Sequence, residues 1–184
     1  METKAIILKK QNTNEYDQLV TCYTQEFGRM TAIAKSILKN SSIQAMHLDL
    51  FNLVEFDLVN GNGFPIITGA QAEHTYPEMK SSIRSISAVF VIGEYIDKLA
   101  PDYYKDDILW DFIGRTLQQL NFTTVNPRDI LIKSQKELLQ ILGYHYPDSG
   151  RQPTFASLNT VFEEAANRQF KAVNFFYLVN PVLK

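Results

Sequence analysis

Residues 19–34 of this chain are LVTCYTQEFGRMTAIA, and no other stretch constrains the architecture as strongly. Leu19 to Thr24 is rich in β-branched and aromatic residues, which favour strands, and Met30 to Ala34 resumes the strand pattern. Between them, Glu26-Phe27-Gly28 is a turn signal, because Gly28 can adopt the positive φ that many tight turns require. The stretch therefore predicts a hairpin of two short strands.

Three further strand signals flank this hairpin. Ala5–Leu8 is a short apolar run, residues 50–58 alternate with apolar side chains on both faces, and residues 65–72 follow a strong Asn-Gly-Asn-Gly turn signal at 60–63. Five short strands, with a gap at about residues 36–48 long enough for a turn of helix, are typical of an OB-fold barrel. A small SH3-like barrel would give a similar pattern, and periodicity alone does not separate the two.

From Pro77 onward the apolar residues recur with helical spacing. The pattern predicts one helix that ends before Pro101 and a second that Asp106 or Asp107 can cap. A third helix is expected to begin at Asn126-Pro127 and to end at Gly143, a typical C-terminal glycine.

The last part of the chain also shows helical periodicity. One long helix or two abutting ones are expected to fill residues 154–179, and Thr160 and Glu163 have the spacing of a capping box. The expected fold class is therefore α+β. A five-stranded OB-fold barrel spans residues 1–76, and an all-helical domain spans residues 77–184.

Composition excludes several classes of protein. Of the 184 residues, 45% are hydrophobic and 21% are charged, which is ordinary for a globular chain. The longest apolar runs are too short for a signal peptide or a membrane span, so a cytoplasmic protein without membrane attachment is expected. Cys22 is the only cysteine and the three histidines are dispersed, so we predict no disulfide, no zinc and no other cofactor.

Charge is distributed unevenly, although the net charge is only −2. Residues 27–47 hold Arg29, Lys35 and Lys39 and no carboxylate, and such a patch can attract a polyanion. A cluster of acidic side chains follows much later in the chain, at Asp102, Asp106, Asp107 and Asp111. We interpret this cluster as helix-capping groups rather than as a catalytic site.

An ordered set of blocks carries a family resemblance. It begins with an apolar strand, an acidic loop and a second strand, and continues with a glycine, a basic residue and a final alanine-lysine pair. The matching blocks are Thr3–Leu8, Glu15–Thr21, Phe27–Lys35, Leu50–Phe56, Gly93–Leu99 and Leu138–Tyr144. Over about residues 1–146 this set resembles the RecO family of bacterial recombination mediators.

The resemblance implies a function without bond-making chemistry. RecO-like proteins act in the RecF pathway of DNA repair and recombination, where they bind and anneal single- and double-stranded DNA. They also contact RecR and the acidic C-terminal tail of the single-strand-binding protein. The same partners are therefore expected for this chain.

A basic groove with exposed aromatic side chains would serve DNA binding. The residues of the barrel that could supply it are Lys9, Lys10, Arg29, Lys35, Lys39 and Phe64, with Tyr16 and Tyr23 as further stacking candidates. Each has an alternative role, because the lysines can be ordinary solvated residues and Tyr23, beside Cys22 in mid-strand, fits the core better. Cys22 itself is expected to be a small buried hydrophobe.

An acidic tail that ends in an apolar residue and a carboxylate needs an apolar pocket with cations at its rim. The third helix offers Arg128, Lys133 and Lys136 near Leu131 and Leu138. Simple surface pairs with neighbouring carboxylates are the alternative for these cations.

One departure from the family pattern supports a different function. Relatives usually follow the alanine-lysine pair with glycine and several basic residues, whereas this chain has Ser36-Ile37-Leu38-Lys39. The protein could therefore be an adaptor that holds its protein partners but hardly touches DNA. If the barrel residues are not the DNA site, Arg115 and Arg151 are the next candidates, and an unrelated enzyme or ligand-binding module is a third possibility.

Overall fold

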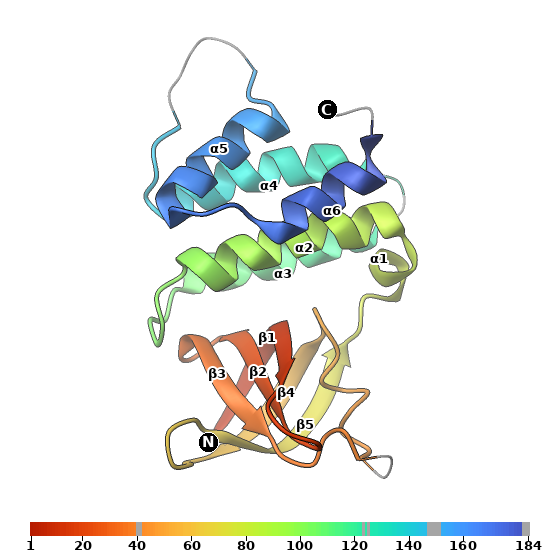
Figure 1. The fold of residues 1–184 in the computed structure, drawn as a ribbon, viewed down its shortest axis with the longest axis vertical. Coiled ribbons are helices and arrows are strands. Elements are labelled where there is room, and N and C mark those ends of the chain that lie inside the picture. The colour runs from red at the N-terminus through yellow and green to blue at the C-terminus, as the bar shows by residue number, and fades with distance from the viewer. Residues whose placement is uncertain (40–41, 123, 125, 147–151, 182–184) are drawn as a thin grey trace. The chain divides into compact units, whose positions relative to one another are not determined.

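A computed structural model describes residues 1–39, 42–122, 124, 126–146 and 152–181 (Figure 1). The chain divides into two compact units, one of residues 1–75 with 101–110 and the other of residues 76–100 with 111–184. Within the described residues, no helix is both long and apolar enough to cross a membrane. Arg151, a reserve candidate for DNA contact, lies outside the described residues.

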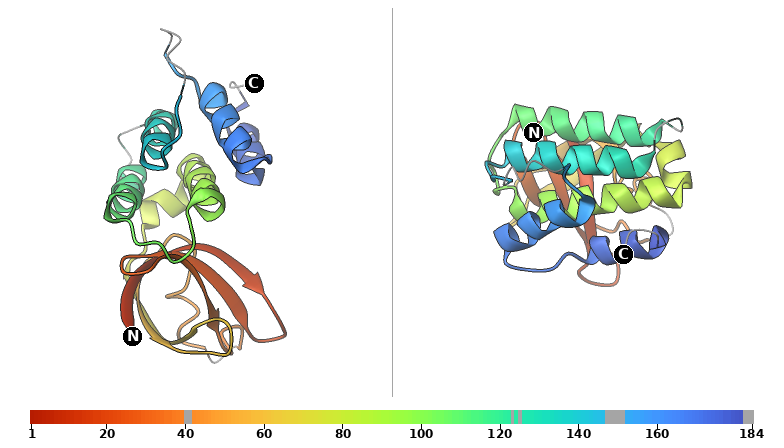
Figure 2. Two further views of the ribbon diagram at one scale, coloured as in Figure 1. Left: turned by 90° about the vertical axis from the view of Figure 1, so that its left-hand side faces the viewer. Right: turned by 90° about the horizontal axis from the view of Figure 1, so that it is seen from above.

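The first unit is built on five strands. They are β1 (Glu2–Asn12), β2 (Gln18–Thr24), β3 (Gly28–Ala34), β4 (Leu53–Val59) and β5 (Ile66–His74). Strands β1–β2, β2–β3, β4–β5 and β1–β4 pair antiparallel, and a short parallel pairing of β3 with β5 closes the ring. The order β1-β2-β3-β5-β4 is that of an OB-fold barrel, and the strands wrap around its interior in Figure 2, left. The predicted barrel followed by helices is confirmed.

Alternate side chains of the strands fill the barrel. On β3, Met30, Ala32 and Ala34 are buried, whereas Thr31 and Ile33 between them point outward. The core comprises Ala5, Ile7, Val20, Cys22, Met30, Ala32, Ala34, Ile37, Leu48, Val54, Phe56, Leu58 and Ile67. Burial also raises the pKa of the Cys22 thiol to about 12, so this cysteine behaves as the expected small hydrophobe.

The β2–β3 turn depends on Gly28. Its φ is +67°, and a Cβ at this position would lie 1.9 Å from the carbonyl oxygen of Tyr104. Only glycine therefore allows residues 101–106 to pack on the hairpin. The Tyr103 N–H donates to the Arg29 carbonyl (2.9 Å), and the Tyr23 hydroxyl donates to the Asp106 carbonyl (3.4 Å). We call residues 101–106 the hairpin clamp.

The connection between β3 and β4 differs from the expected turn of helix. Its described residues form turns, and Ile37 and Leu48 insert into the barrel core. Strand β4 begins at Leu53 rather than near residue 50, because Phe51 has a φ of +61° and breaks the extended backbone. The Phe51 N–H instead donates to the Ile7 carbonyl (2.8 Å).

The second unit begins with two helices where one was expected. These are α1 (Pro77–Ser81) and α2 (Ile83–Leu99). Ser82 between them is extended, with φ −97° and ψ 112°, and its side chain accepts a hydrogen bond from the Ser85 N–H. A short polar cap therefore splits a sequence whose apolar spacing runs on without a break.

The next two helices follow the predicted capping pattern. Helix α3 (Asp107–Asn121) is capped by Asp106, whose Oδ1 accepts from the N–H groups of residues 108 and 109 at 2.9 and 3.0 Å. Helix α4 (Pro127–Ile141) is capped by Asn126, and Gly143 after it has a φ of +77°. These caps confirm the predicted starts of both helices and the glycine after α4.

The C-terminal helices are α5 (Phe155–Ala166) and α6 (Lys171–Val179), two separate helices. The predicted capping box at Thr160 and Glu163 is wrong, because the box is formed by Thr154 and Ser157. Thr160 lies inside α5 and donates to the Ala156 carbonyl (3.1 Å). The helix starts earlier than its capping signal suggested because Phe155 and Leu158 are already buried.

Helix α2 is the centre of this unit and packs against α4, α5 and α6 (Figure 2, right). A buried polar group joins three of these helices. The Tyr95 hydroxyl donates to Asn159 Oδ1 (2.8 Å) and accepts from Gln135 Nε2 (3.0 Å). The Tyr95 ring stacks on Phe162 with ring centroids 3.8 Å apart. Gln135 Oε1 is buried without a hydrogen-bond partner among the described residues.

Candidate nucleic-acid interface

Hydrogen bonds tie the β1–β2 loop to the segment that follows β3. Asn14 Oδ1 accepts from the N–H groups of Tyr16 (2.9 Å) and Asp17 (2.7 Å). Asp17 Oδ1 accepts from the Ser36 N–H (2.6 Å), and the Leu38 N–H donates to the Tyr16 carbonyl (3.0 Å). The hydrogen bonds from Ser36 and Asn14 lower the pKa of the Asp17 carboxyl, so this anchor stays ionised.

The anchored loop brings an aromatic ring and two cations together. Lys39 Nζ lies 5.3 Å from the centroid of the Tyr16 ring, within the range of a cation–π interaction. Lys35 is near enough to lower the pKa of Asp17 by its charge, as Lys39 also is. All three side chains are exposed. We call Tyr16, Lys35 and Lys39 the basic corner.

Phe64 lies at the same end of the barrel. The Ile33 N–H donates to the Pro65 carbonyl (2.8 Å), and Ile33 pairs with Ile66 at the start of β5. The β4–β5 turn is thus held against the end of β3, and Lys35 is the first residue after that strand. Phe64 in this turn is 42% exposed. An exposed aromatic side chain and the basic corner therefore share one rim of the barrel.

Arg29 is the sequence candidate that the structure separates from this rim. It begins β3, whereas Lys35 follows the end of that strand, so at about 3.3 Å per residue the two lie roughly 20 Å apart. The Arg29 guanidinium lies 3.2 Å from Asp102 Oδ1 in the hairpin clamp. The three cations of residues 29–39 therefore do not form one patch.

The other barrel candidates occupy different environments. Lys9 is exposed on β1, opposite Thr21 of β2. Lys10 is partly covered, and its Nζ lies 3.5 Å from Asp49 Oδ1. Tyr23 is only 1% exposed, and burial raises the pKa of its hydroxyl. It is therefore covered rather than displayed, as its position beside Cys22 suggested.

Two anchoring residues, Asn14 and Asp17, were not singled out in the sequence. The signal was present, because asparagine and aspartate commonly bond to nearby backbone N–H groups in turns. What the sequence could not give was the second half of the contact, the Ser36 N–H that Asp17 binds. That bond holds the backbone between Lys35 and Lys39 against the β1–β2 loop.

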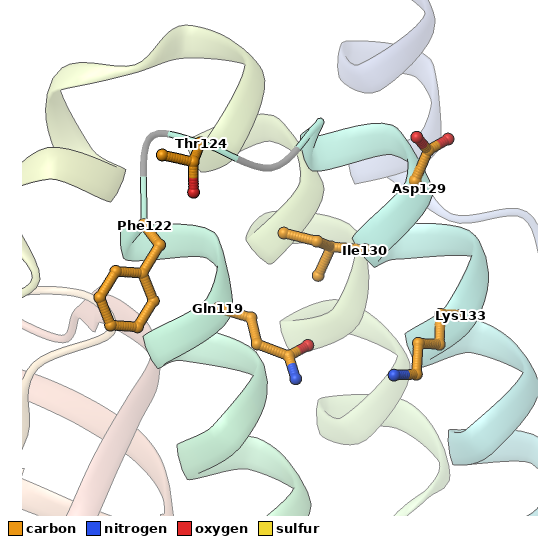
Figure 3. A pocket seen from close by; sticks show the side chains of 6 residues that line it. All are labelled: Gln119, Phe122, Thr124, Asp129, Ile130 and Lys133. Carbon is orange, nitrogen blue, oxygen red and sulfur yellow. The ribbon is translucent and has the colours of Figure 1, made fainter.

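The helical unit contains a pocket of about 420 Å³ between the end of α3 and the start of α4 (Figure 3). Lys133 and Gln119 face this space from the two helices, and the Ile130 side chain points into it. Phe122, 67% exposed, and Asp129 complete the rim. The pocket combines apolar lining with a cation at its edge.

Only part of the predicted tail-binding set meets at this pocket. Lys133 lines it, but Arg128 and Lys136 are exposed elsewhere on α4 and are not among its lining residues. Leu131 and Leu138, expected beside the pocket, are completely buried in the helical core. The apolar surface is supplied instead by Ile130 and by Phe122, the residue directly after α3.

Across the described part of the chain, no group of three or more His, Cys, Asp or Glu side chains is placed to hold a metal ion. Arg115, a further reserve cation, pairs with Glu137 Oε1 at 2.7 Å on the helical unit.

Comparisons with known proteins agree with the barrel. Residues 1–76 match the family model described as recombination protein O N terminal. The chain is 28% identical over 123 residues to a DNA repair protein RecO of Dehalococcoides mccartyi, an alignment that covers 67% of this chain and 49% of the relative. A protein of the same description from Geobacter metallireducens is 26% identical over 142 residues, covering 77% and 58%.

A third relative, a DNA repair protein RecO of a Roseiflexus species, is 26% identical over 167 residues and covers 90% of this chain and 56% of its own length. The chain thus spans about half the length of the curated relatives it matches. The similarity to them extends from the barrel into the helical unit.

Proposed function

We propose that this chain, whose residues 1–76 match the family model described as recombination protein O N terminal, belongs to the RecO family and is a non-enzymatic recombination mediator in DNA repair. In this role it binds and anneals DNA at the barrel and contacts partner proteins at the helical unit. The observation that carries the DNA-binding part is the basic corner, where Lys39 lies 5.3 Å from the Tyr16 ring beside exposed Lys35.

The chemistry of the corner suits single-stranded DNA. Two ammonium groups can follow adjacent phosphates, while the faces of Tyr16 and Phe64 are available to unstacked bases at the same rim. Base stacking tolerates any sequence, so binding of this kind would not discriminate between sequences. Lys9 lies on β1, the strand that precedes the Tyr16 loop, and can extend the contact along the backbone of the DNA.

A salt series tests this proposal. If Lys35 and Lys39 each neutralise one phosphate, the log–log dependence of affinity on salt should have a slope of about −1.4, from about −0.7 per contact on single strands. Fluorescence anisotropy with a labelled oligothymidine should show this slope for the full chain. Lys35→Glu with Lys39→Glu should abolish the slope and most of the affinity at low salt.

The matched control reverses two cations of the helical unit, Arg168→Glu with Lys171→Glu, which changes the net charge by the same amount. This variant should keep the wild-type slope. Equal losses in the two double variants would mean that the effect is one of net charge alone. Unchanged binding in the Lys35/Lys39 variant would place the DNA site elsewhere on the protein.

For the helical unit, we propose that the α3–α4 pocket receives the acidic C-terminal tail of the single-strand-binding protein. Lys133 would meet the terminal carboxylate, and Ile130 and Phe122 would contact its apolar side chain. Lys133→Glu and Phe122→Ala should each lower the affinity of the protein for a labelled tail peptide. Lys136→Glu, which changes a cation outside the pocket, should not. A contact with RecR is proposed on family grounds alone, and a pull-down with purified RecR tests it.

One observation favours a second candidate function, that of an adaptor with little DNA binding. Glu15 and Asp17 bring two carboxylates to the loop that holds the basic corner, and Glu15 accepts a hydrogen bond from Tyr16 (2.7 Å). Arg29 and Lys10 face aspartates as well. If the full chain shows no oligonucleotide binding at low salt but captures RecR or the tail peptide, the adaptor function is correct.

A further inference from the structure

A second pocket lies on the outside of the barrel, over β4 and β5, and has a volume of about 320 Å³. Its floor exists because residue 69 is a glycine. Gly69 is the register partner of Asp57, and a Cβ at this position would lie 2.5 Å from Asp57 Oδ2. Glu55 and Gln71, the next outward-facing pair, extend the same row. We call this hollow the β4–β5 pocket.

Three carboxylates line the pocket, those of Glu2, Glu55 and Asp57, and no lysine or arginine is among its lining residues. Glu2 and Asp57 are direct register partners on β1 and β4, an arrangement in which like charges destabilise a sheet. None of the three carboxylates has an ion-pair partner recorded among the described residues. The fold thus holds three carboxylates together at a hollow, and of these Glu55 alone faces a cation across the sheet, Lys4.

Two cations of the barrel, Lys4 and the amino group of Met1, form their hydrogen bonds outside the pocket. Lys4, which is the register partner of Glu55, has its Nζ 2.7 Å from Glu73 Oε1. That hydrogen bond raises the pKa of the Lys4 ammonium, and the charges of Glu73, Glu55 and Glu26 raise it as well. Lys4 therefore stays charged, bonded to Glu73 and attracted to Glu55. The amino group of Met1 donates to the Leu58 carbonyl (2.7 Å). Neither cation lines the pocket.

The rim of the pocket is held in place by the β3–β4 connection. Gln44 Nε2 donates to the Thr68 carbonyl (3.1 Å), and the Ala72 N–H donates to His47 Nδ1 (3.2 Å). These bonds fix the connection against β5 and leave the Ile43 side chain at the rim 80% exposed. A preformed rim lowers the ordering cost of binding, and its apolar side chain offers a contact beside the charges.

We propose that the β4–β5 pocket binds an arginine or lysine side chain of an extended basic segment of a partner protein, with an adjacent apolar side chain of that segment on Ile43. Charge complementarity selects this occupant, since a row of carboxylates attracts a cationic side chain and repels nucleic-acid phosphates. An arginine fits best, because its planar group can bond to two carboxylates at once. The pocket is a protein contact separate from the basic corner.

A peptide titration followed by nuclear magnetic resonance tests the proposal on the full, ¹⁵N-labelled chain. The probe is an acetylated and amidated peptide that alternates arginine and leucine. Its addition up to about 1 mM, enough to detect a weak complex, should shift the amides of residues 55–57, 69–71 and 43–47. A peptide with glutamate in place of arginine should not shift them. Absence of shifts there with the arginine peptide overturns the proposal.

Glu55→Gln with Asp57→Asn should lower the affinity for the arginine peptide about tenfold, which is the loss expected when two exposed charge pairs are removed. The matched control is Asp111→Asn with Glu164→Gln, one exposed aspartate and one exposed glutamate of the helical unit. It should change the affinity less than about twofold. Equal effects of the two double variants would show unspecific charge attraction and refute a site.

Gly69→Ala provides a second, charge-neutral variant in case the double neutralisation impairs folding. Its methyl group would occupy the pocket floor and displace the Asp57 carboxylate. The variant should therefore also bind the arginine peptide with lower affinity. Wild-type affinity in this variant would contradict the proposal. Oligonucleotide added to the same sample should shift residues 35–39 instead, so failure of the peptide site and failure of the DNA site are distinguishable.

Discussion

Replacing Gly28 by alanine should detach the hairpin clamp and destabilise the barrel. At a φ of +67° an alanine carries about 1–2 kcal/mol of backbone strain. Its Cβ would lie 1.9 Å from the Tyr104 carbonyl oxygen, so the clamp must move away. That movement removes the hydrogen bond from Tyr103 to Arg29, about 1 kcal/mol. The ion pair of Arg29 with Asp102, up to about 1 kcal/mol, is lost as well.

Alanine also restricts the unfolded chain, which offsets up to about 1 kcal/mol of this loss. The net destabilisation should therefore be about 2–3 kcal/mol, measured as the free energy of unfolding in urea by circular dichroism. Gly143→Ala is the matched control, since Gly143 has a φ of +77° and nothing within 4 Å of an added Cβ. It should show the backbone strain alone. If Gly28→Ala costs no more than Gly143→Ala, the clamp contributes nothing and the reasoning fails.

Three further predictions concern buried or anchoring groups. The Cys22 thiol, with its pKa raised to about 12 by burial, should resist a thiol reagent at neutral pH, and Gly28→Ala should accelerate labelling. Because hydrogen bonds from Ser36 and Asn14 lower the pKa of Asp17, its contribution to stability is complete above the ordinary value of 3.8 and is lost as pH falls through the lowered pKa. Asp17→Asn should remove that part of the acid dependence in urea titrations. Tyr95→Phe leaves Asn159 Oδ1 and Gln135 Nε2 buried without their partner and should cost about 2–4 kcal/mol. Burial raises the pKa of Tyr95, so the wild type should lose stability above the ordinary value of 10.0, and this alkaline loss should be smaller in Tyr95→Phe.

Local sequence signals predicted the parts of the fold that local chemistry determines. The β2–β3 hairpin follows from its β-branched strands and from Gly28, and the caps at Asp106 and Asn126 mark true helix starts. The errors occur where a weak local signal competes with burial. Thr160 has capping spacing but lies within α5, because the apolar face that packs the helix already begins at Phe155. Burial of an apolar face stabilises a helix more than one capping bond does.

The candidate DNA site shows what a charge count along a sequence omits. Arg29, Lys35 and Lys39 are close in sequence and free of intervening carboxylates, yet a strand separates the first from the others. Its carboxylate partner, Asp102, lies more than seventy positions away in the hairpin clamp. The screening of a cation by a carboxylate depends on their distance in the fold, so residues remote in sequence decide which cations remain available to a phosphate.

The same reasoning connects the two faces of the barrel. Among the described residues, the exposed cations Lys9, Lys35 and Lys39 have no ion pair and belong to β1 and to the segment after β3. The pocket carboxylates Glu2, Glu55 and Asp57 belong to β1 and β4. A net charge of −2 therefore conceals an uneven distribution of charge, with two exposed lysines at the basic corner and three carboxylates at the β4–β5 pocket. A polyanion at one surface and a basic protein segment at the other would not compete for the same residues. Simultaneous binding of oligonucleotide and arginine peptide, each with unchanged affinity, is the behaviour that this separation of charge requires.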